Sequence, residues 1–305
     1  MKKEGSRLRS YASPLLNEGG IALVLTLMIV ALITAMVVEF AYGVYVNTTA
    51  LHNWQTSQGL SVEARSATKL AAKLISERGR DFYTGDVFEI SQKVPFGDLD
   101  STITLRIEDE NGKFNLNQLA GISLNPDQDP NKMFVRLVRA LGLKDEVADR
   151  ISDWIDSDHE PRVGDSENGA KNAALDSIDE LLLIPGIDMQ TYQKLLPYVT
   201  IYTDKSAFQI NINSADVPVL MSLSDSIDRD LAERIVRYRT GEPFRRVQDI
   251  KNVLGVSDQL PIALQGLATT QGTAFHVIAA AEAGGVKRVV ESVLYGNAVL
   301  YWKEM

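Results

Sequence analysis

The feature that most constrains this chain is an uncharged apolar stretch of 18 residues, 21–38. A helix of that length is about 27 Å long at ~1.5 Å per residue, close to the thickness of the hydrocarbon layer of a membrane. Four basic side chains precede the stretch and favour an N-terminus on the cytoplasmic side: Lys2, Lys3, Arg7 and Arg9. The stretch therefore predicts a single membrane span, with the bulk of the chain outside the cytoplasm.

The junction before this stretch carries a second signal, because Gly20 stands directly before Ile21. A basic leader that ends in glycine before an apolar run resembles a type IV prepilin signal, in which cleavage falls between these two residues. By that resemblance residues 1–20 are a cleaved leader and Ile21 is the mature N-terminus. Two alternatives stay open: a secretory signal peptide cut near Ala41, and an uncleaved anchor with no role in assembly.

Leu25 occupies the fifth position of the chain that such cleavage would leave. Most pilins carry a glutamate there, and the resemblance implies that it pairs with the N-terminal amine of a neighbouring subunit. A carboxylate inside a membrane is costly without a partner, so it is normally kept only for such a pairing. A subunit with Leu25 cannot offer this pairing to a subunit stacked above it.

The apolar pattern continues behind the span. Small and apolar residues recur at three- and four-residue spacing as far as Arg78, which predicts one helix over about 21–80, with 21–46 in the membrane and Gly79 at its end. Segments 87–94, 102–108, 274–281, 288–294 and 298–302 have the composition or alternation of strands. The sequence thus predicts an α+β fold, in which a long N-terminal helix packs on an antiparallel sheet formed by 81–111 and 267–305.

The region between the two groups of strands, 112–266, has a helical pattern and predicts an inserted all-α domain. It contains a duplication. Asn115-Leu116-Asn117 is answered by Asn211-Ile212-Asn213, residues 148–151 by 232–235, and the apolar and glycine positions of 175–187 by those of 244–256 at a spacing of 69 residues. The copies, about 113–204 and 205–266, resemble pairs of helix-hairpin-helix units.

Helix-hairpin-helix units suggest an alternative function, that of a membrane-anchored, competence-like DNA-binding protein. Such hairpins bind phosphate through backbone N–H groups at a Gly-x-Gly turn. The turns at Gly142, Gly186, Ser226 and Gly255 lack the second glycine, and residues 112–266 carry 17 basic against 24 acidic side chains. Because phosphate binding requires the opposite charge balance, we interpret the repeat as a packing scaffold and expect no nucleic-acid partner. The paired asparagines are then capping and turn residues.

The copies differ most in an acidic loop of the first one. Residues 145–167 contain nine acidic and two basic side chains. Asp-x-Asp in a loop presents two carboxylates on the same side, which suits the six to eight oxygen ligands that Ca²⁺ prefers. The simpler interpretation is a solvated acidic loop without a metal.

Three features together resemble the protein K family, the minor pseudopilins of bacterial type II secretion systems. They are the missing glutamate at Leu25, the insertion between strands, and the pattern DWxDxD followed by Gly and Glu at residues 153–167. By motif match, the resemblance implies Asp156, Asp158 and Glu167 as calcium ligands, with Asp153 and Asp165 as weaker candidates. The resemblance implies one calcium site. Relatives usually carry a longer stretch before Lys171-Asn172, and this shortening argues against a second site and could alter the first.

The resemblance also implies a place in an assembly. It predicts an inner-membrane, single-pass protein with a periplasmic bulk, processed and methylated by prepilin peptidase. Its expected position is the tip of a periplasmic pseudopilus, with the minor pseudopilins I and J as partners and a role in initiation and capping. The sequence does not distinguish a type II system from a related pilus system.

Composition excludes several classes of chemistry. The chain has no cysteine, so disulfides and thiolate sites are excluded, and its three histidines are far apart. GxSxG, a Walker loop and GxGxxG after a strand are all missing from the sequence. We therefore expect no catalytic activity.

Overall fold

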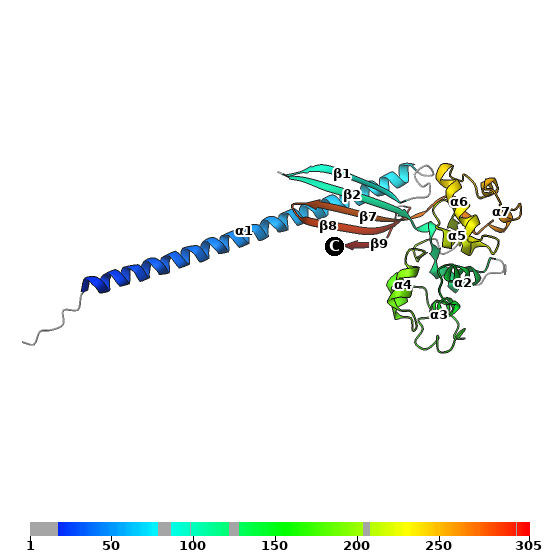
Figure 1. The fold of residues 1–305 in the computed structure, drawn as a ribbon, viewed down its shortest axis with the longest axis horizontal. Helices are drawn as coiled ribbons and strands as arrows, with labels where there is room; N and C mark the ends of the chain where they lie inside the picture. The colour runs from blue at the N-terminus through cyan, green and yellow to red at the C-terminus, as the bar shows by residue number, and fades with distance from the viewer. Residues whose placement is uncertain (1–17, 79–86, 98, 122–127, 204–207, 297) are drawn as a thin grey trace, which may run out of the picture. The chain divides into compact units, whose positions relative to one another are not determined.

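The computed structural model describes residues 18–78, 87–97, 99–121, 128–203, 208–296 and 298–305 (Figure 1). The chain divides into two compact units, Met1–Thr56 and Ser57–Met305. Helix α1 (Glu18–Arg78) runs through the described part of the first unit into the second. The predicted leader residues 1–17 and the predicted helix end at Gly79 lie outside the described residues.

The first unit consists of α1 as far as Thr56. Its large apolar side chains are exposed, among them Leu25, Met28 and Phe40. This part of α1 is the one described helix that is long and apolar enough to cross a membrane. An exposed apolar surface of this length is stable only when lipid or another apolar surface covers it.

The second unit contains a five-stranded antiparallel sheet in the order β1-β2-β7-β8-β9 (Figure 1). The strands are β1 (Phe88–Phe96), β2 (Leu99–Asp109), β7 (Ala274–Ala283), β8 (Val286–Tyr295) and β9 (Ala298–Glu304). All five expected strands form, and each is longer than its apolar pattern, because the ladder continues toward the turns. Gly284 and Gly285 turn β7 into β8 with φ of 56° and 76°, which favour glycine.

The second half of α1 packs on one face of this sheet. Alanines 64, 67 and 71 of the helix are buried together with sheet residues such as Leu105 and Ala279. Small side chains allow the helix backbone to approach the sheet closely. Arg65 donates to Glu304 of β9 at 2.7 Å, and Arg288 of β8 donates to Ser57 Oγ at 2.7 Å. This is the predicted arrangement of a long helix on an antiparallel sheet.

The segment between β2 and β7 forms the inserted domain with a hydrophobic core of its own. Its first half contains η2 (Glu110–Gly112), β3 (Phe114–Asn115), η3 (Leu116–Ala120), α2 (Pro130–Ala140), α3 (Asp145–Ile155), η5 (Ile178–Leu183), α4 (Met189–Leu195) and β4 (Val199–Thr200). Its second half contains β5 (Ile210–Asn211), α5 (Val217–Leu223), α6 (Arg229–Gly241), η6 (Val247–Asn252), α7 (Leu260–Ala263) and β6 (Ala268–Thr269).

In the described part of the insert, short parallel strand pairs depart from the expected all-α domain. β3 pairs with β4 in the first copy, and β5 pairs with β6 in the second. Each pair joins the beginning of a copy to its end, so each copy closes on itself. Because β6 pairs with β5, the second copy extends to Thr269, three residues beyond the predicted boundary at 266. The pairs escaped sequence analysis because each strand is two residues long, too short for an alternating pattern.

The paired asparagines act in the same way in both copies. Asn117 accepts from Leu175 N at 2.7 Å and donates to Leu175 O at 3.0 Å. Asn213 accepts from Phe244 N at 2.9 Å and donates to Phe244 O at 2.8 Å. Asn115 and Asn211 accept from the N–H two residues ahead. Their expected role as capping and turn residues is confirmed.

Three consecutive residues attach the insert to the sheet. Asp109 Oδ2 accepts from Asn211 at 2.6 Å and from Ser214 at 2.8 Å, both in the second copy. Glu110 accepts from Thr200 Oγ1 of the first copy. Asn111 accepts from the N–H groups of Thr273 and Ala274, where the chain returns to β7. Each copy and the returning strand therefore have an anchor of their own.

Candidate metal site

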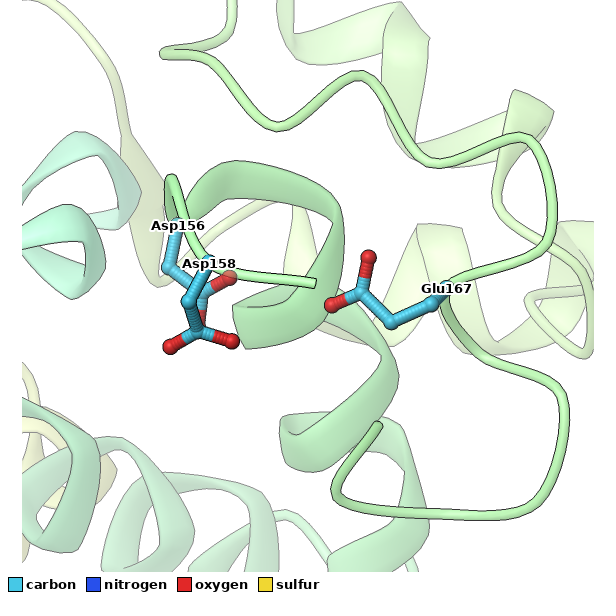
Figure 2. Close-up of side chains that lie close together, drawn as sticks. All are labelled: Asp156, Asp158 and Glu167. Carbon is cyan, nitrogen blue, oxygen red and sulfur yellow. The ribbon is translucent and has the colours of Figure 1, made fainter. Parts of the chain in front are cut away.

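The predicted Asp-x-Asp pair lies where helix α3 ends. Asp156 is the C-cap residue, and its N–H donates to Ser152 O at 2.9 Å. Its extended backbone (φ −70°, ψ 166°) turns the chain out of the helix, so that Asp158 follows on the exposed side. Glu167 arrives from the returning part of the loop, and Figure 2 shows its carboxylate pointing toward the other two.

The three carboxylates converge on one point. Asp156, Asp158 and Glu167 each offer an oxygen, and these oxygens lie within 4.8 Å of one another. Asp156 is 6% exposed, and its Oδ1 is buried without a hydrogen-bond partner among the described residues. Both carboxylate oxygens of Glu167 are also buried and have no hydrogen-bond partner among the described residues. Burial raises the pKa of Asp156, although hydrogen bonding to Arg162 opposes this shift.

Unpartnered carboxylate oxygens in a buried position are costly, because they have lost water and gained no donor. A cation at this point would satisfy them. Carboxylate oxygens without histidine or cysteine suit a hard cation such as Ca²⁺ or Mg²⁺. The residues present therefore fit the metal that the family resemblance implied.

The two weaker candidates point elsewhere. Asp153 is fully buried, and its oxygens accept from Arg162 Nη1 at 2.5 Å, from Arg162 N at 2.9 Å and from Ser166 Oγ. Asp165 accepts from Arg150 Nη1 at 3.4 Å. The structure thus brings together Asp156, Asp158 and Glu167. Asp153 and Asp165 instead accept hydrogen bonds from arginines.

Two residues for which sequence analysis predicted no role, Arg162 and Asn172, complete this loop. Arg162 bridges two carboxylates, because its Nη1 donates to Asp153 Oδ1 at 2.5 Å and also to Asp156 Oδ2. Asn172 closes the loop, because its N–H donates to Trp154 O at 3.0 Å and its side chain contacts His159 Nδ1 at 2.5 Å. Asn172 has a φ of 51°, a conformation that asparagine tolerates better than most residues. Spacing alone does not reveal either contact.

The hairpin turns bear on the alternative of DNA binding. Gly186 and Gly255 have φ of 88° and 89°, and each faces an arginine of its own copy, Arg150 or Arg234. The N–H that follows each glycine donates within the turn, Ile187 N to Ile184 O and Val256 N to Val253 O. One N–H of each of these two turns is thus engaged inside the chain, where it does not face a ligand.

Comparison with protein families gives the same description for both halves of the insert. Residues 112–204 and residues 210–270 each match a family model of type II secretion system protein K, and together they make up about half of the chain. The chain belongs to the type II secretion system protein K family. Both matched segments lie between the end of β2 at Asp109 and the start of β7 at Ala274. The insert therefore carries the sequence that is typical of the family.

Individual relatives agree with this assignment. Type II secretion system protein K of Pseudomonas aeruginosa is 28% identical over 91% of this chain and 89% of that protein. The Klebsiella pneumoniae protein K is 28% identical over 65% of this chain and 67% of that protein. The Dickeya chrysanthemi protein K is 31% identical over 39% of this chain and 37% of that protein.

A solved structure shares the fold. The GspK-GspI-GspJ complex of the enterotoxigenic Escherichia coli type 2 secretion system contains a chain that matches with a TM-score of 0.65 at 20% identity. The match covers 85% of this chain and 99% of that one. The expected family and fold class are therefore confirmed, and membership of the protein K family supports a minor pseudopilin role, which is structural.

Proposed function

We propose that this chain is a minor pseudopilin at the tip of the periplasmic pseudopilus of a type II secretion system, where it initiates and caps the assembly. The observation that carries the proposal is the family-specific insert between β2 and β7. An α1 helix long and apolar enough for a membrane supports an inner-membrane anchor. The second unit would then lie in the periplasm.

Two features support a tip position. Leu25 lies on α1 and cannot provide the carboxylate that would pair with the N-terminus of a subunit above. The insert adds a second folded body to the helix-on-sheet unit, which would hinder further stacking. A related K chain is found in complex with I and J chains, which supports pseudopilins I and J as partners here.

Processing by prepilin peptidase is the first test. Intact mass and N-terminal sequencing of the membrane-extracted chain, from cells with and without the peptidase, should give a methylated chain that starts at Ile21 only when the peptidase is present. A chain cut near Ala41, or left uncut in both strains, would contradict the pseudopilin proposal. The insert would then belong to an exported or anchored binding module.

The tip position has a separate test in the residue at position 25. Leu25→Glu should supply the missing acceptor and allow a subunit to stack above, whereas Leu25→Gln should not. The chain has no cysteine, so a single cysteine introduced into α1 reports such a neighbour by crosslinking without background. Equal crosslinking in the two variants would count against the capping role, and co-purification of I and J tests the partners.

We also propose that the cluster of Asp156, Asp158 and Glu167 binds one calcium ion. Bound there, calcium would neutralise three carboxylates and make the order of the loop depend on metal. This assignment is supported by Asp156 Oδ1 and the two Glu167 oxygens, which are buried and have no hydrogen-bond partner in the described part of the chain. Calorimetric titration of the full chain in detergent micelles should give one equivalent, and Asp158→Asn or Glu167→Gln should weaken binding at least tenfold. An unchanged affinity in both variants would reject the site.

A further inference from the structure

A cleft of about 700 Å³ between the sheet and the insert has no part in the functions proposed so far. Its floor is the sheet face that is turned away from α1, because side chains point alternately to the two faces of a strand and Ile107, Val277 and Ala279 face the helix. Its other wall comes mainly from η5, α4 and β4 of the first copy. A volume of this size is typical of ligand sites.

The cleft carries a surplus of negative charge. Six carboxylates line it, against three lysine or arginine side chains and one histidine. Arg106 Nε donates to Glu108 at 3.1 Å, and Lys113 Nζ donates to Glu110 at 2.6 Å, so two of the three cations are already neutralised inside the cleft. The third, Lys303, is exposed and forms no ion pair with a described residue, although it stands opposite a carboxylate in the ladder of β8 and β9.

Two of the carboxylates that line the cleft have no lysine or arginine partner in the described chain. Asp179 accepts a hydrogen bond from the Tyr192 hydroxyl at 2.6 Å. Glu291 contacts His276 Nε2 at 2.9 Å, and His276 Nδ1 also lies 3.9 Å from Glu108. One imidazole is therefore shared by two carboxylates, and the charges of Asp179 and Glu291 are left largely uncompensated.

Two tyrosine rings lie beside these carboxylates. The ring centroids of Tyr202, which follows β4, and Tyr301 of β9 are 6.0 Å apart, and the ring planes are tilted by 45°. Burial raises the pKa of Tyr202 to about 12, and Tyr301 and nearby carboxylates, among them Glu291 and Asp179, add to this rise. Burial also raises the pKa of Tyr301, and the same two carboxylates add to it. The two rings and the two carboxylates thus surround one place in the cleft.

Aromatic faces attract cations, and a guanidinium can stack on a ring while its planar N–H groups donate to carboxylates. We propose that this cleft binds an arginine side chain from an extended basic segment of another protein. The guanidinium lies against the two tyrosine rings and donates to Asp179 and Glu291. The rest of the cleft has room for the neighbouring residues of the segment. This proposal depends neither on the tip position nor on the calcium site.

The test uses the full chain in micelles of an uncharged detergent and two short peptides, one with a single arginine among glycines and one with citrulline in its place. Citrulline keeps the shape of arginine but is neutral. Titration followed by peptide-observed NMR should show that the arginine peptide binds about tenfold more tightly than the citrulline peptide. Equal binding of the two peptides to the native chain would overturn the proposal, and this comparison requires no variant.

Variants separate the cleft from the general attraction of an acidic chain for a basic peptide. Asp179→Asn and Glu291→Gln should each weaken binding of the arginine peptide about fivefold, whereas Asp258→Asn, at an exposed position outside the cleft, should leave it unchanged. Tyr301→Leu should weaken binding about threefold, and Tyr301→Phe, which keeps the ring, should not. Equal losses in Asp258→Asn and Asp179→Asn contradict the proposal, because the affinity then follows net charge alone.

Discussion

The two copies of the repeat share the same packing scaffold and differ in the length of the connection between two of its segments. Each has an asparagine that clamps a backbone amide, Asn117 on Leu175 and Asn213 on Phe244. In the second copy, Phe244 follows almost directly after α6 ends at Gly241, whereas in the first the acidic loop intervenes between Ile155 and Leu175. A short connection is thus sufficient for the fold, and the long one is available for another task.

The copies also differ in how they are attached to the sheet. Asp109 anchors the second copy through Asn211 and Ser214, and Glu110 anchors the first through Thr200. Burial raises the pKa of Asp109 to about 6, although hydrogen bonds from Ser214 and Asn211 oppose this shift. Attachment of the second copy should therefore depend on pH in the range in which Asp109 titrates.

The largest expected effect comes from removing the asparagine clamps. Asn213 is 3% exposed and also donates to Thr270 O, so Asn213→Ala leaves buried backbone groups unpartnered and should cost about 3 kcal/mol of unfolding free energy. Asn117 is partly exposed, and Asn117→Ala should cost about 2 kcal/mol. Denaturant unfolding of the full chain measures both, with the exposed Asn252→Ala as a neutral control. A cost near zero for Asn213→Ala would contradict the shared-clamp interpretation.

The next effect is the pH dependence of the Asp109 anchor. A carboxyl whose pKa is raised on folding binds more protons in the folded state, so the unfolding free energy falls as pH rises from about 4 to about 6, by up to about 3 kcal/mol. Asp109→Asn should abolish this decline. Hydrogen exchange should locate it at residues 210–215 and not at Thr200. The pKa of Glu108 is lowered to about 2, chiefly by the His276 hydrogen bond. Its contribution therefore has the opposite sign, because the unfolding free energy falls as pH drops below about 4.5.

A smaller effect should be equal in the two copies. Gly186 and Gly255 have positive φ, so Gly186→Ala and Gly255→Ala should each cost about 1 kcal/mol from backbone strain. An added Cβ would also lie 3.0 or 3.1 Å from an arginine side chain, which can move aside. Gly241→Ala, with open space around it, should cost nothing. Clearly unequal costs for Gly186→Ala and Gly255→Ala would show that the hairpins are not equivalent.

The smallest effect should come from Asp165, which only the first copy has. Its contact with Arg150 is 3.4 Å long and its side chain is 69% exposed, so Asp165→Asn should change the unfolding free energy by less than about 0.5 kcal/mol. Calcium affinity should stay unchanged, because this carboxylate does not join the cluster. A tenfold loss of affinity would restore Asp165 as a ligand, and Asp158→Asn provides the positive control.

Much of the fold follows from local pattern. The apolar stretch before Glu39, the strand alternation and the duplicated asparagines each specify an element that the structure contains. Period and capping are properties of neighbouring residues, so one sequence is enough to recognise them. The two-residue parallel strands were not predictable, because each exists only through a partner about sixty to ninety residues away.

The residues of the candidate metal site also divide into those that the sequence pointed to and those whose contacts required the tertiary structure. The sequence by itself determined that residues 153–167 would be acidic, and the family motif selected Asp156, Asp158 and Glu167 from among them. Only the tertiary structure decided that Asp153 faces Arg162 rather than the cluster, and that Asn172 closes the loop on Trp154. The physical reason is that buried charge is stabilised by whatever lies across from it in space, and the path of the chain sets that partner.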